Sequence, residues 1–259
     1  LVLPNKNYFE IIVDKQQNFS IETDTLDFIN HMKITGSSDN QLFYDYLKFI
    51  TSKGKFADSL SKTIKQMSDK DTNKVKVFTD SISRLKIKGR AVEKEINHYK
   101  DKYAKDHPET FLAKVFTSMP EPEVPDSLTQ KYKSDSTFPF RYYKKHFFDN
   151  VDLSDDRLLR TPVLYGKVEK YMQKLTIQIP DSINKEADYL CNKARGNKEV
   201  FKFIVHYITN TFEKSNIMGM DAVFVHMAQS YYMKGDAYWI DTAQLSKITE
   251  RANKLAPLL

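Results

Sequence analysis

The sequence predicts a mainly helical protein that begins with a β-hairpin. Up to Gly36, apolar residues alternate with polar ones, which is the period of a half-buried strand. Beyond Gly36 they recur every three or four positions, as on an amphipathic helix. Helix-starting residues punctuate the second half of the chain. We therefore expect an N-terminal β-hairpin, a long antiparallel αα-hairpin, and then a helical bundle or an irregular stack of helices.

Length and composition exclude several classes of protein. The 259 residues suffice for one large core or two linked cores. Cys191 is the single cysteine, so it cannot form an internal disulfide, and no His or Cys residues have zinc-site spacing. No apolar run approaches the roughly 18 residues of a membrane span, and no basic-then-apolar leader is present. We expect a soluble segment, trimmed from a longer chain, that needs no cofactor.

The positive charge is carried mostly by lysine. The net charge is +6, and the basic residues are 33 Lys and 7 Arg. Lysine is a hydrated point charge, whereas arginine has the planar fork that suits base and phosphate recognition. The densest basic stretch, residues 84–105, has eight Lys or Arg against three acidic residues, which is typical of a solvated helix face. Nucleic-acid binding through this stretch is therefore the least favoured function.

The N-terminal segment alternates in two short runs. Residues 9–13 and 19–23 both have the strand period, with polar residues 14–17 between them, which predicts an antiparallel hairpin. Such a hairpin is marginal alone in water. It either completes a sheet whose other strands precede Leu1 or packs on the helices that follow. A further short strand is expected around residues 31–35.

A heptad pattern follows Gly36 in two arms. The expected seam residues are Leu42, Tyr46, Phe49, Phe56, Leu60 and Met67 in the first arm and Val75, Phe78, Ile82, Leu85, Val92, Ile96, Tyr99 and Tyr103 in the second. Polar residues 68–71 separate the arms, so we expect them to fold back on each other. Gly54 and Gly89 interrupt the arms, where we expect a kink or a close helix contact.

Prolines mark the next boundaries. Pro108 starts a short apolar helix that Pro120 stops, and a polar stretch with three prolines follows. The chain thus divides into four parts. These are residues 1–36, the tail of a truncated β domain; 37–118, the αα-hairpin and the following helix; 119–137, a Pro/acidic connection; and 138–259, a helical subdomain.

Capping residues predict the helices of the last part. Ser154 is expected to cap a turn that begins with two aspartates, and Thr161 to cap a helix with Pro162 at its first position. Further helices are expected from Pro180 to about Gly196, over residues 197–215, from Asp221 to Lys234, and from Asp241 onward.

Aromatic and basic residues are concentrated in residues 138–148. This composition suits stacking on a ligand together with phosphate binding. Helical spacing, however, places four rings on one face, namely Phe140, Tyr143, Phe147 and Phe148. We therefore favour packing in a core over stacking on a ligand, because burial of aromatic area is the larger and more general driving force.

Arginines next to acidic residues provide the candidate contacts. Arg157 and Arg160 lie one helical turn apart, beside Asp155 and Asp156, and could grip a carboxylate or a phosphate. Pairing within the chain is the simpler interpretation. The candidate contacts to a partner or an anion are Arg141, His146, Arg157 and Arg160.

No catalytic or metal-binding motif accompanies them. Cys191 has no flanking signature of a nucleophile, and His206 and His226 lack metal spacing. We interpret these three as ordinary helix residues and Trp239 as a packing anchor.

Several segments resemble a known family. They are Phe-Phe-Asp-Asn-Val-Asp at 147–152, Asp-Asp-Arg-Leu-Leu-Arg-Thr-Pro at 155–162, and residues 7–24, 224–228, 231–239 and 255–259. Together they resemble the helical domain of unknown function that precedes a thioredoxin-like domain in bacterial envelope thiol-disulfide interchange proteins. Residues 7–24 look like the end of the small β domain at the start of such proteins.

The resemblance implies a context for the chain. It implies a lipid-anchored parent in the periplasm or cell envelope, with a downstream thioredoxin-like domain as partner and envelope proteins as substrates. The Cys-X-X-Cys pair of that domain has no match here, so no catalytic residue carries over. We expect a non-catalytic accessory or docking module of a thiol-disulfide oxidoreductase. The alternative is a helical scaffold that binds an extended peptide or an envelope protein between the αα-hairpin and the later helices.

Overall fold

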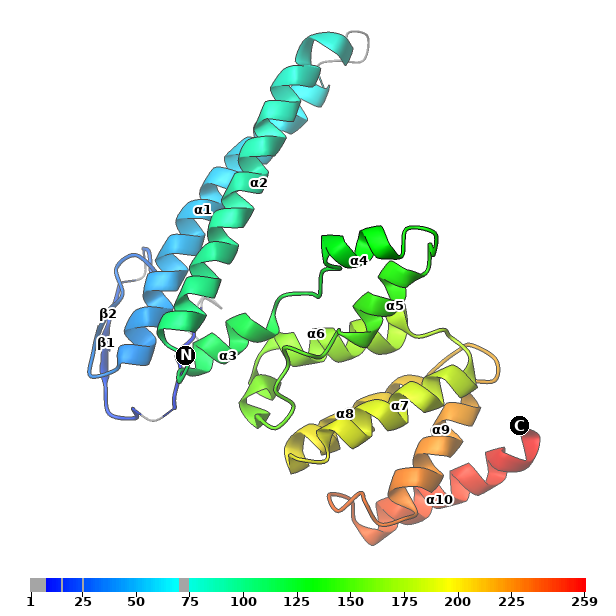
Figure 1. Cartoon of the computed structure of the whole chain (residues 1–259). Helices are drawn as coiled ribbons and strands as arrows, with labels where there is room; N and C mark the ends of the chain where they lie inside the picture. The colour runs from blue at the N-terminus through cyan, green and yellow to red at the C-terminus, as the bar shows by residue number, and fades with distance from the viewer. Residues whose placement is uncertain (1–7, 15, 25, 70–74) are drawn as a thin grey trace. The chain divides into compact units, whose positions relative to one another are not determined.

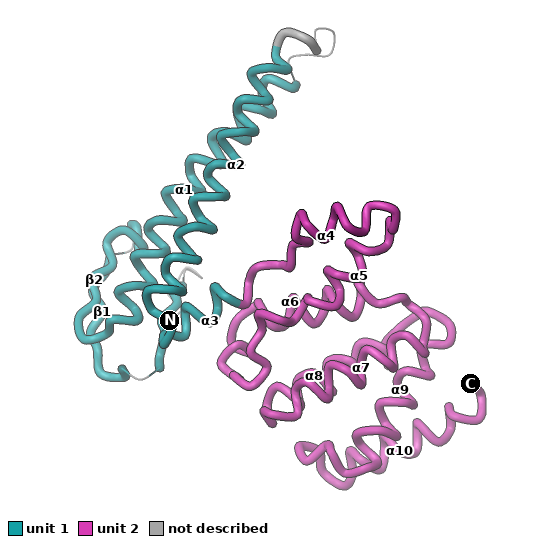
Figure 2. Tube along the Cα trace, in the orientation of Figure 1, with its two compact units in different colours: residues 1–117 teal, residues 118–259 magenta. Residues whose placement is uncertain are grey.

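The protein is mainly helical and divides into two compact units. The computed structural model describes residues 8–14, 16–24, 26–69 and 75–259, and of residues 75–77 the backbone alone. Unit 1 spans Leu1–Thr117 and unit 2 spans Ser118–Leu259 (Figure 2). Helices dominate both units, and a two-stranded antiparallel sheet precedes them (Figure 1). The predicted fold class is confirmed.

The hairpin of unit 1 uses different strands from those expected. Strand β1 (Ser20–Glu22) pairs with β2 (Lys33–Thr35), and Ile21 lies opposite Ile34. The strand expected around residues 31–35 is therefore real, and it is the partner of the second predicted run. The first predicted run, residues 9–13, forms no strand, so that pairing was wrong.

Side chains of the first helix explain this difference. In α1 (Ser38–Asp69), the fully buried Asn40 accepts a hydrogen bond from the Ile12 N–H and donates one to the Ile12 carbonyl, each at 2.7 Å. The Tyr44 hydroxyl donates to the Glu10 carbonyl at 2.9 Å. Because α1 satisfies these backbone groups, the segment needs no neighbouring strand. The N-terminal segment thus packs on the helix that follows it.

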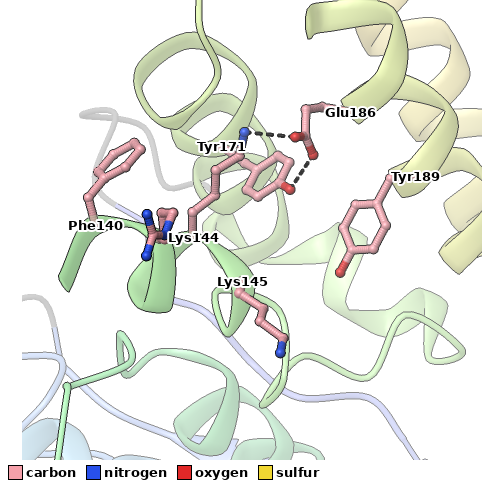
Figure 3. Close-up of a pocket in the computed structure, with 7 residues that line it drawn as sticks. Phe140, Lys144, Lys145, Tyr171, Glu186 and Tyr189 are labelled. Atoms are coloured by element: carbon pink, nitrogen blue, oxygen red, sulfur yellow. Dashed lines mark hydrogen bonds and ion pairs between the residues drawn. The ribbon is translucent and has the colours of Figure 1, made fainter. Parts of the chain in front are cut away.

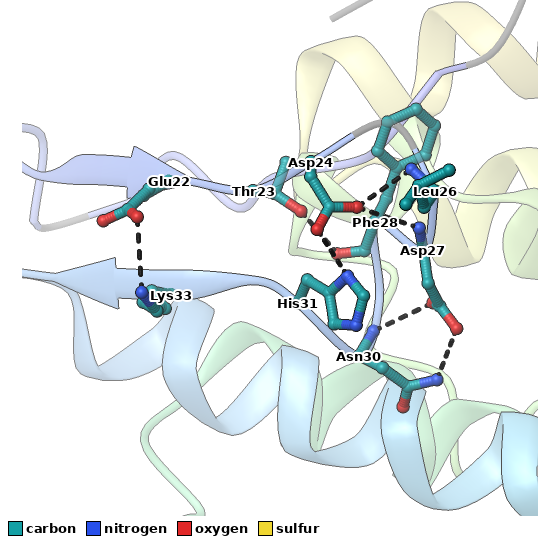
Figure 4. A network of polar contacts seen from close by, with 9 residues as sticks. All are labelled: Glu22, Thr23, Asp24, Leu26, Asp27, Phe28, Asn30, His31 and Lys33. Carbon is teal, nitrogen blue, oxygen red and sulfur yellow. Dashed lines mark hydrogen bonds and ion pairs between the residues drawn. The ribbon is translucent and has the colours of Figure 1, made fainter.

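The loop between β1 and β2 is closed by two aspartates (Figure 4). Asp24 accepts from the backbone N–H groups of Leu26 and Asp27, and its carboxylate lies 2.6 Å from His31 Nδ1. Asp27 in turn accepts from the backbone and side chain of Asn30. These hydrogen bonds hold the pKa values of both carboxyl groups below their usual range. Such local bonds favour a turn over a longer strand.

The αα-hairpin folds as the heptads predict. Helix α2 (Val75–Asp106) packs along α1, and Tyr46, Leu60, Val92 and Tyr103 of the seam are buried. Phe49 stacks on Tyr99, with ring centroids 4.5 Å apart. Phe56 is 48% exposed, so its assignment to the buried seam was wrong. The side chain of Val75 and residues 70–71 of the predicted break at 68–71 lie outside the described residues, and Ser68 and Asp69 belong to α1.

Helix α3 (Phe111–Ser118) closes the base of the hairpin. Its Leu112 and Phe116 are buried, and the Phe116 ring meets the rings of Tyr46 and Tyr103 edge-on at 4.6 and 5.3 Å. The core of unit 1 therefore lies where α3 covers the open end of the two long helices.

Unit 2 is an irregular stack of helices (Figure 1). Its elements are α4 (Asp126–Lys131), α5 (Phe138–Lys145), η1 (Asp156–Arg160), α6 (Pro162–Lys170), η2 (Tyr171–Leu175), α7 (Pro180–Ala194), α8 (Lys198–Glu213), α9 (Asp221–Met227), η3 (Ala228–Tyr232), α10 (Thr242–Leu255) and η4 (Ala256–Leu258). Helices α7, α8, α9 and α10 each pack on the next. Elements η2 and η3 are π-helical turns that continue α6 and α9.

Most predicted helix starts in unit 2 are confirmed. The Thr161 hydroxyl accepts from the Val163 N–H at the start of α6. Asp241 and Gln244 form a capping box at the start of α10. The polar stretch over residues 119–137 also contains a helix, α4, which begins after Pro125.

One predicted cap was wrong. Asp155, and not Ser154, caps η1, because its carboxylate accepts from the Arg157 N–H. The N–H and hydroxyl of Ser154 bind the Asp152 carboxylate instead. An aspartate two residues upstream therefore competes for the serine that the sequence pattern favours.

The glycines differ in how close an added Cβ would lie to neighbouring atoms. This difference predicts how substitution by alanine changes stability. An added Cβ at Gly54 or Gly89 has nothing within 4 Å, so the expected close helix contact is absent. We expect Gly54→Ala and Gly89→Ala each to raise the free energy of unfolding by about 0.5–1 kcal/mol, since alanine restricts the unfolded chain and favours helix. Urea unfolding followed by circular dichroism measures this. Loss of stability at both positions would contradict the account.

Gly36 is the matched control. Its φ is +90°, and a Cβ there would lie 3.0 Å from the Asn18 carbonyl oxygen. Gly36→Ala is therefore expected to lower the free energy of unfolding by about 1 kcal/mol or more.

Candidate functional site

The candidate site is an open pocket of about 290 Å³ in unit 2 (Figure 3). It lies between α5, η2 and α7. Its lining residues are Phe140, Arg141, Lys144, Lys145, Tyr171, Glu186 and Tyr189. The pocket thus combines three cationic side chains, three aromatic rings and one carboxylate, which is the composition of a binding surface for an anionic partner.

Helix α5 carries the cationic wall of the pocket, and it is short. It ends at Lys145, and the buried Phe147 and Phe148 follow in the next turn. The predicted face of four rings needed a helix that continues through residue 148. Phe140 is instead 50% exposed at the pocket, so its assignment to the core was wrong, whereas the burial of Phe147 and Phe148 is confirmed.

A sheltered ion pair forms the centre of the pocket. Glu186 accepts from Lys144 Nζ at 2.8 Å with one carboxylate oxygen and from the Tyr171 hydroxyl at 2.5 Å with the other. The side chains of Lys144 and Glu186 are 20% and 18% exposed. Burial, and then Glu186, raise the pKa of Tyr171, so its hydroxyl stays protonated and donates. This arrangement joins α5, η2 and α7.

The side chains at the rim of the pocket have fewer partners within the chain than those at its centre. Arg141 reaches back to Asp135 at 2.6 Å and Thr137 at 2.9 Å. Lys145 is exposed, and within the part of the chain that the structure describes it has no ion-pair or hydrogen-bond partner. Tyr189 is 36% exposed, and its hydroxyl likewise has no partner among the described residues. The rim therefore offers an ammonium and a hydroxyl to a ligand.

Of the four predicted contact residues, one lies at the pocket. Arg141 lines it. His146 contacts Asp149 at 2.6 Å, and Arg157 pairs with Asp155 through Nε at 2.9 Å and its terminal nitrogen at 2.7 Å.

Arg157 thus pairs within the chain, as the simpler interpretation predicted. Arg160 is exposed and does not line the pocket.

Sequence reasoning missed the α7 side of the pocket. Lys144 and Glu186 are 42 positions apart, and no local pattern indicates that they meet. A second long-range group lies on α7, where Asp188 contacts His226 Nε2 at 2.9 Å and accepts from the Tyr231 hydroxyl at 2.7 Å. The one available signal was that Glu186 and Tyr189 are one turn apart on a predicted helix.

The single thiol is sequestered. Cys191 is fully buried on α7, and burial raises the pKa of the thiol to about 12. Across the described ranges, no group of three or more His, Cys, Asp or Glu side chains is placed to hold a metal ion. None of the described helices has the length and apolar character required to cross a membrane.

Two ion pairs engage the basic stretch of α2. Glu95 pairs with Lys53 of α1, and Asp106 pairs with Lys102 one turn away. Asp106 thus balances one positive charge of residues 84–105, whereas Glu95, an acidic residue of that stretch, is paired with a lysine of α1.

A family model matches residues 91–256, which include every residue of the pocket. It is the model of a domain of unknown function (DUF5106). The chain belongs to this family. Searches of curated proteins and of solved structures returned no match.

The central ion pair leads to a prediction about stability. Glu186→Gln keeps the side-chain volume but leaves the Lys144 ammonium without a counter-charge in a sheltered place. We expect the free energy of unfolding to fall by about 1–3 kcal/mol, below the loss for a fully buried pair. The control is Glu250→Gln, whose pair with Lys254 is mostly exposed, and there we expect no measurable change. Equal effects of the two variants in urea unfolding would contradict a special role for Glu186.

The buried thiol predicts a pH dependence. The pKa of Cys191 rises from its ordinary 9.0 to about 12 in the folded state, so the unfolded chain loses this proton first as pH rises. The thiol therefore favours folding below about pH 9 and loses that contribution as pH approaches 12. Relative to Cys191→Ala, the protein should lose up to about 1.4 kcal/mol of unfolding free energy per pH unit in this range. Urea unfolding at about pH 8 and about pH 10 checks this, and identical pH slopes would contradict it.

Proposed function

We propose that this domain is a non-catalytic docking module of an envelope thiol-disulfide oxidoreductase. Its parent is a lipid-anchored protein of the periplasm or cell envelope, with the reactive dithiol on a thioredoxin-like domain. The resemblance of residues 147–162 and the other quoted segments supports this proposal. Membership in a helical family of unknown function agrees with the helical-domain part of that resemblance.

The observation that carries the proposal is the state of the cysteine. Thiol-disulfide exchange requires an accessible thiolate. Cys191 has no exposed surface, and with a pKa of about 12 its thiol stays protonated at neutral pH. The pocket between α5 and α7 instead presents cationic side chains and aromatic rings to solvent. A surface of this kind suits recognition of a partner.

An insulin-reduction assay tests the proposal. With dithiothreitol as the electron donor, we expect the isolated chain to accelerate precipitation of the insulin B chain no more than buffer does. The reason is that the single thiol cannot cycle through an intramolecular disulfide. Turnover that disappears in Cys191→Ser would overturn the proposal.

The coding sequence provides an independent check. After the codon for Leu259, the reading frame is expected to encode a Cys-X-X-Cys pair within about 50 to 100 residues, at the end of a strand and before a helix. A frame without such a pattern would remove the redox parent from the proposal.

The second candidate function is a helical scaffold that binds an extended peptide. The observation that favours it is the same pocket, because its exposed rings and its unpaired ammonium lie within one unit and need no redox partner. This candidate survives if the coding sequence lacks the dithiol.

A further inference from the structure

Unit 2 binds carboxylates twice in the same manner. Glu121 accepts from the Tyr143 hydroxyl and from Lys170, and that ammonium lies 5.4 Å from the Tyr143 ring centroid. In the pocket, Glu186 accepts from the Tyr171 hydroxyl and from Lys144, whose ammonium lies 5.5 Å from the Tyr171 ring centroid. One lysine and one tyrosine therefore form a recurring receptor for one carboxylate.

A lysine and a tyrosine of the pocket have no carboxylate, although the ammonium over the Tyr189 ring, 5.4 Å from its centroid, is that of Lys193 and not of Lys145. Lys145 and Tyr189 both line the pocket, and neither polar group has a partner within the described parts of the chain. Figure 3 shows both side chains below the Lys144–Glu186 pair in that view. We propose that Lys145 and Tyr189 receive the carboxylate of a peptide, with an adjacent aromatic side chain of that peptide against Phe140. This inference rests on the proposed docking function and names the ligand class.

The number of free donors favours a carboxylate over a phosphate. Arg141 and Lys144 each already have a carboxylate counter-charge, in Asp135 and Glu186, so the ammonium of Lys145 is the pocket cation without one among the described residues. A phosphate dianion is held by several charge-assisted donors or by arginine forks. A single carboxylate needs no more than the Lys145 and Tyr189 groups supply.

The exposed rings favour a peptide over a small carboxylate. Phe140 is half exposed and Tyr189 is 36% exposed, and in Figure 3 they flank the central ion pair on opposite sides. Burial of such exposed aromatic surface under another ring is energetically favourable. An acidic residue next to an aromatic one in an extended segment would meet both needs.

NMR titration of the ¹⁵N-labelled chain tests the proposal. The probe is a capped peptide with a Phe-Asp pair between glycines, compared with its Phe-Asn counterpart. We expect the acidic peptide to bind about tenfold more tightly, with shifts at α5 and α7, and to weaken as salt screens the ammonium. Lys145→Gln should reduce its affinity about fivefold and Tyr189→Phe about threefold, the range of partly exposed charge and hydrogen-bond contacts.

Matched controls separate this site from general charge. Lys247→Gln removes an exposed lysine of α10, and Tyr132→Phe removes the hydroxyl of a tyrosine that is 38% exposed, neither of which lines the pocket. Both should leave affinity unchanged.

Several outcomes would overturn the proposal. They are absence of binding, equal affinity for the two peptides, equal loss in the control variants, and displacement of the peptide by an equal concentration of inorganic phosphate. Each would leave the docking function to another surface. Insulin turnover by the chain would overturn the docking function while leaving a peptide site intact.

Discussion

Two buried tyrosines hold α7 from two π-helical turns, and the arrangement of unit 2 depends on them. Tyr171 of η2 donates to Glu186 at 2.5 Å, and Tyr231 of η3 donates to Asp188 at 2.7 Å. Each residue is 3% exposed, and burial raises the pKa of both hydroxyl groups. A phenol buried to this extent needs a hydrogen-bond partner. The two bonds therefore fix where α7 lies along both turns.

The Tyr171 ring also joins α7 to the aromatic core. Phe147 and Phe148 pack on it with centroid distances of 6.0 and 5.1 Å. Lys167 lies 4.7 Å from the centroid of Phe147 and donates to the Pro120 carbonyl at 3.1 Å. Burial lowers the pKa of this lysine, but the ring and the carbonyl compensate its ammonium. The start of the Pro/acidic connection is thereby fixed to α6, although its composition indicates a loose linker.

How much of this was predictable depends on the range of the interaction. Heptad spacing predicted α1 and α2, and Thr161 and Asp241 predicted helix starts, because these signals lie within a few residues of their effect. The strand pairing failed because Asn40 competes for the backbone of residues 9–13 from 28 positions away. The π turns that place Tyr171 and Tyr231 have no period of their own in the sequence.

The candidate site likewise has a part that the local sequence predicts and a part that depends on long-range packing. The cationic and aromatic character of α5 is visible in residues 138–148, but the burial of its rings depends on where the helix ends. Its termination at Lys145 leaves Phe140 at the surface. The Lys144–Glu186 contact comes from the packing of α5 near η2 and α7, and a pattern read along the chain carries no information about it.

These constraints also explain why an exposed pocket persists in a stable unit. The Lys144–Glu186–Tyr171 group joins three elements with few exposed atoms, so α5 and α7 stay in place without burial of Phe140 or Tyr189. Rings left exposed on a rigid support lose little conformational freedom when a ligand covers them. The adjacent Lys145 and Tyr189 have the residue types that elsewhere in the unit hold Glu121 and Glu186. Under the proposed docking function, stability and recognition use the same local chemistry, and they differ in whether the carboxylate belongs to this chain or to a partner.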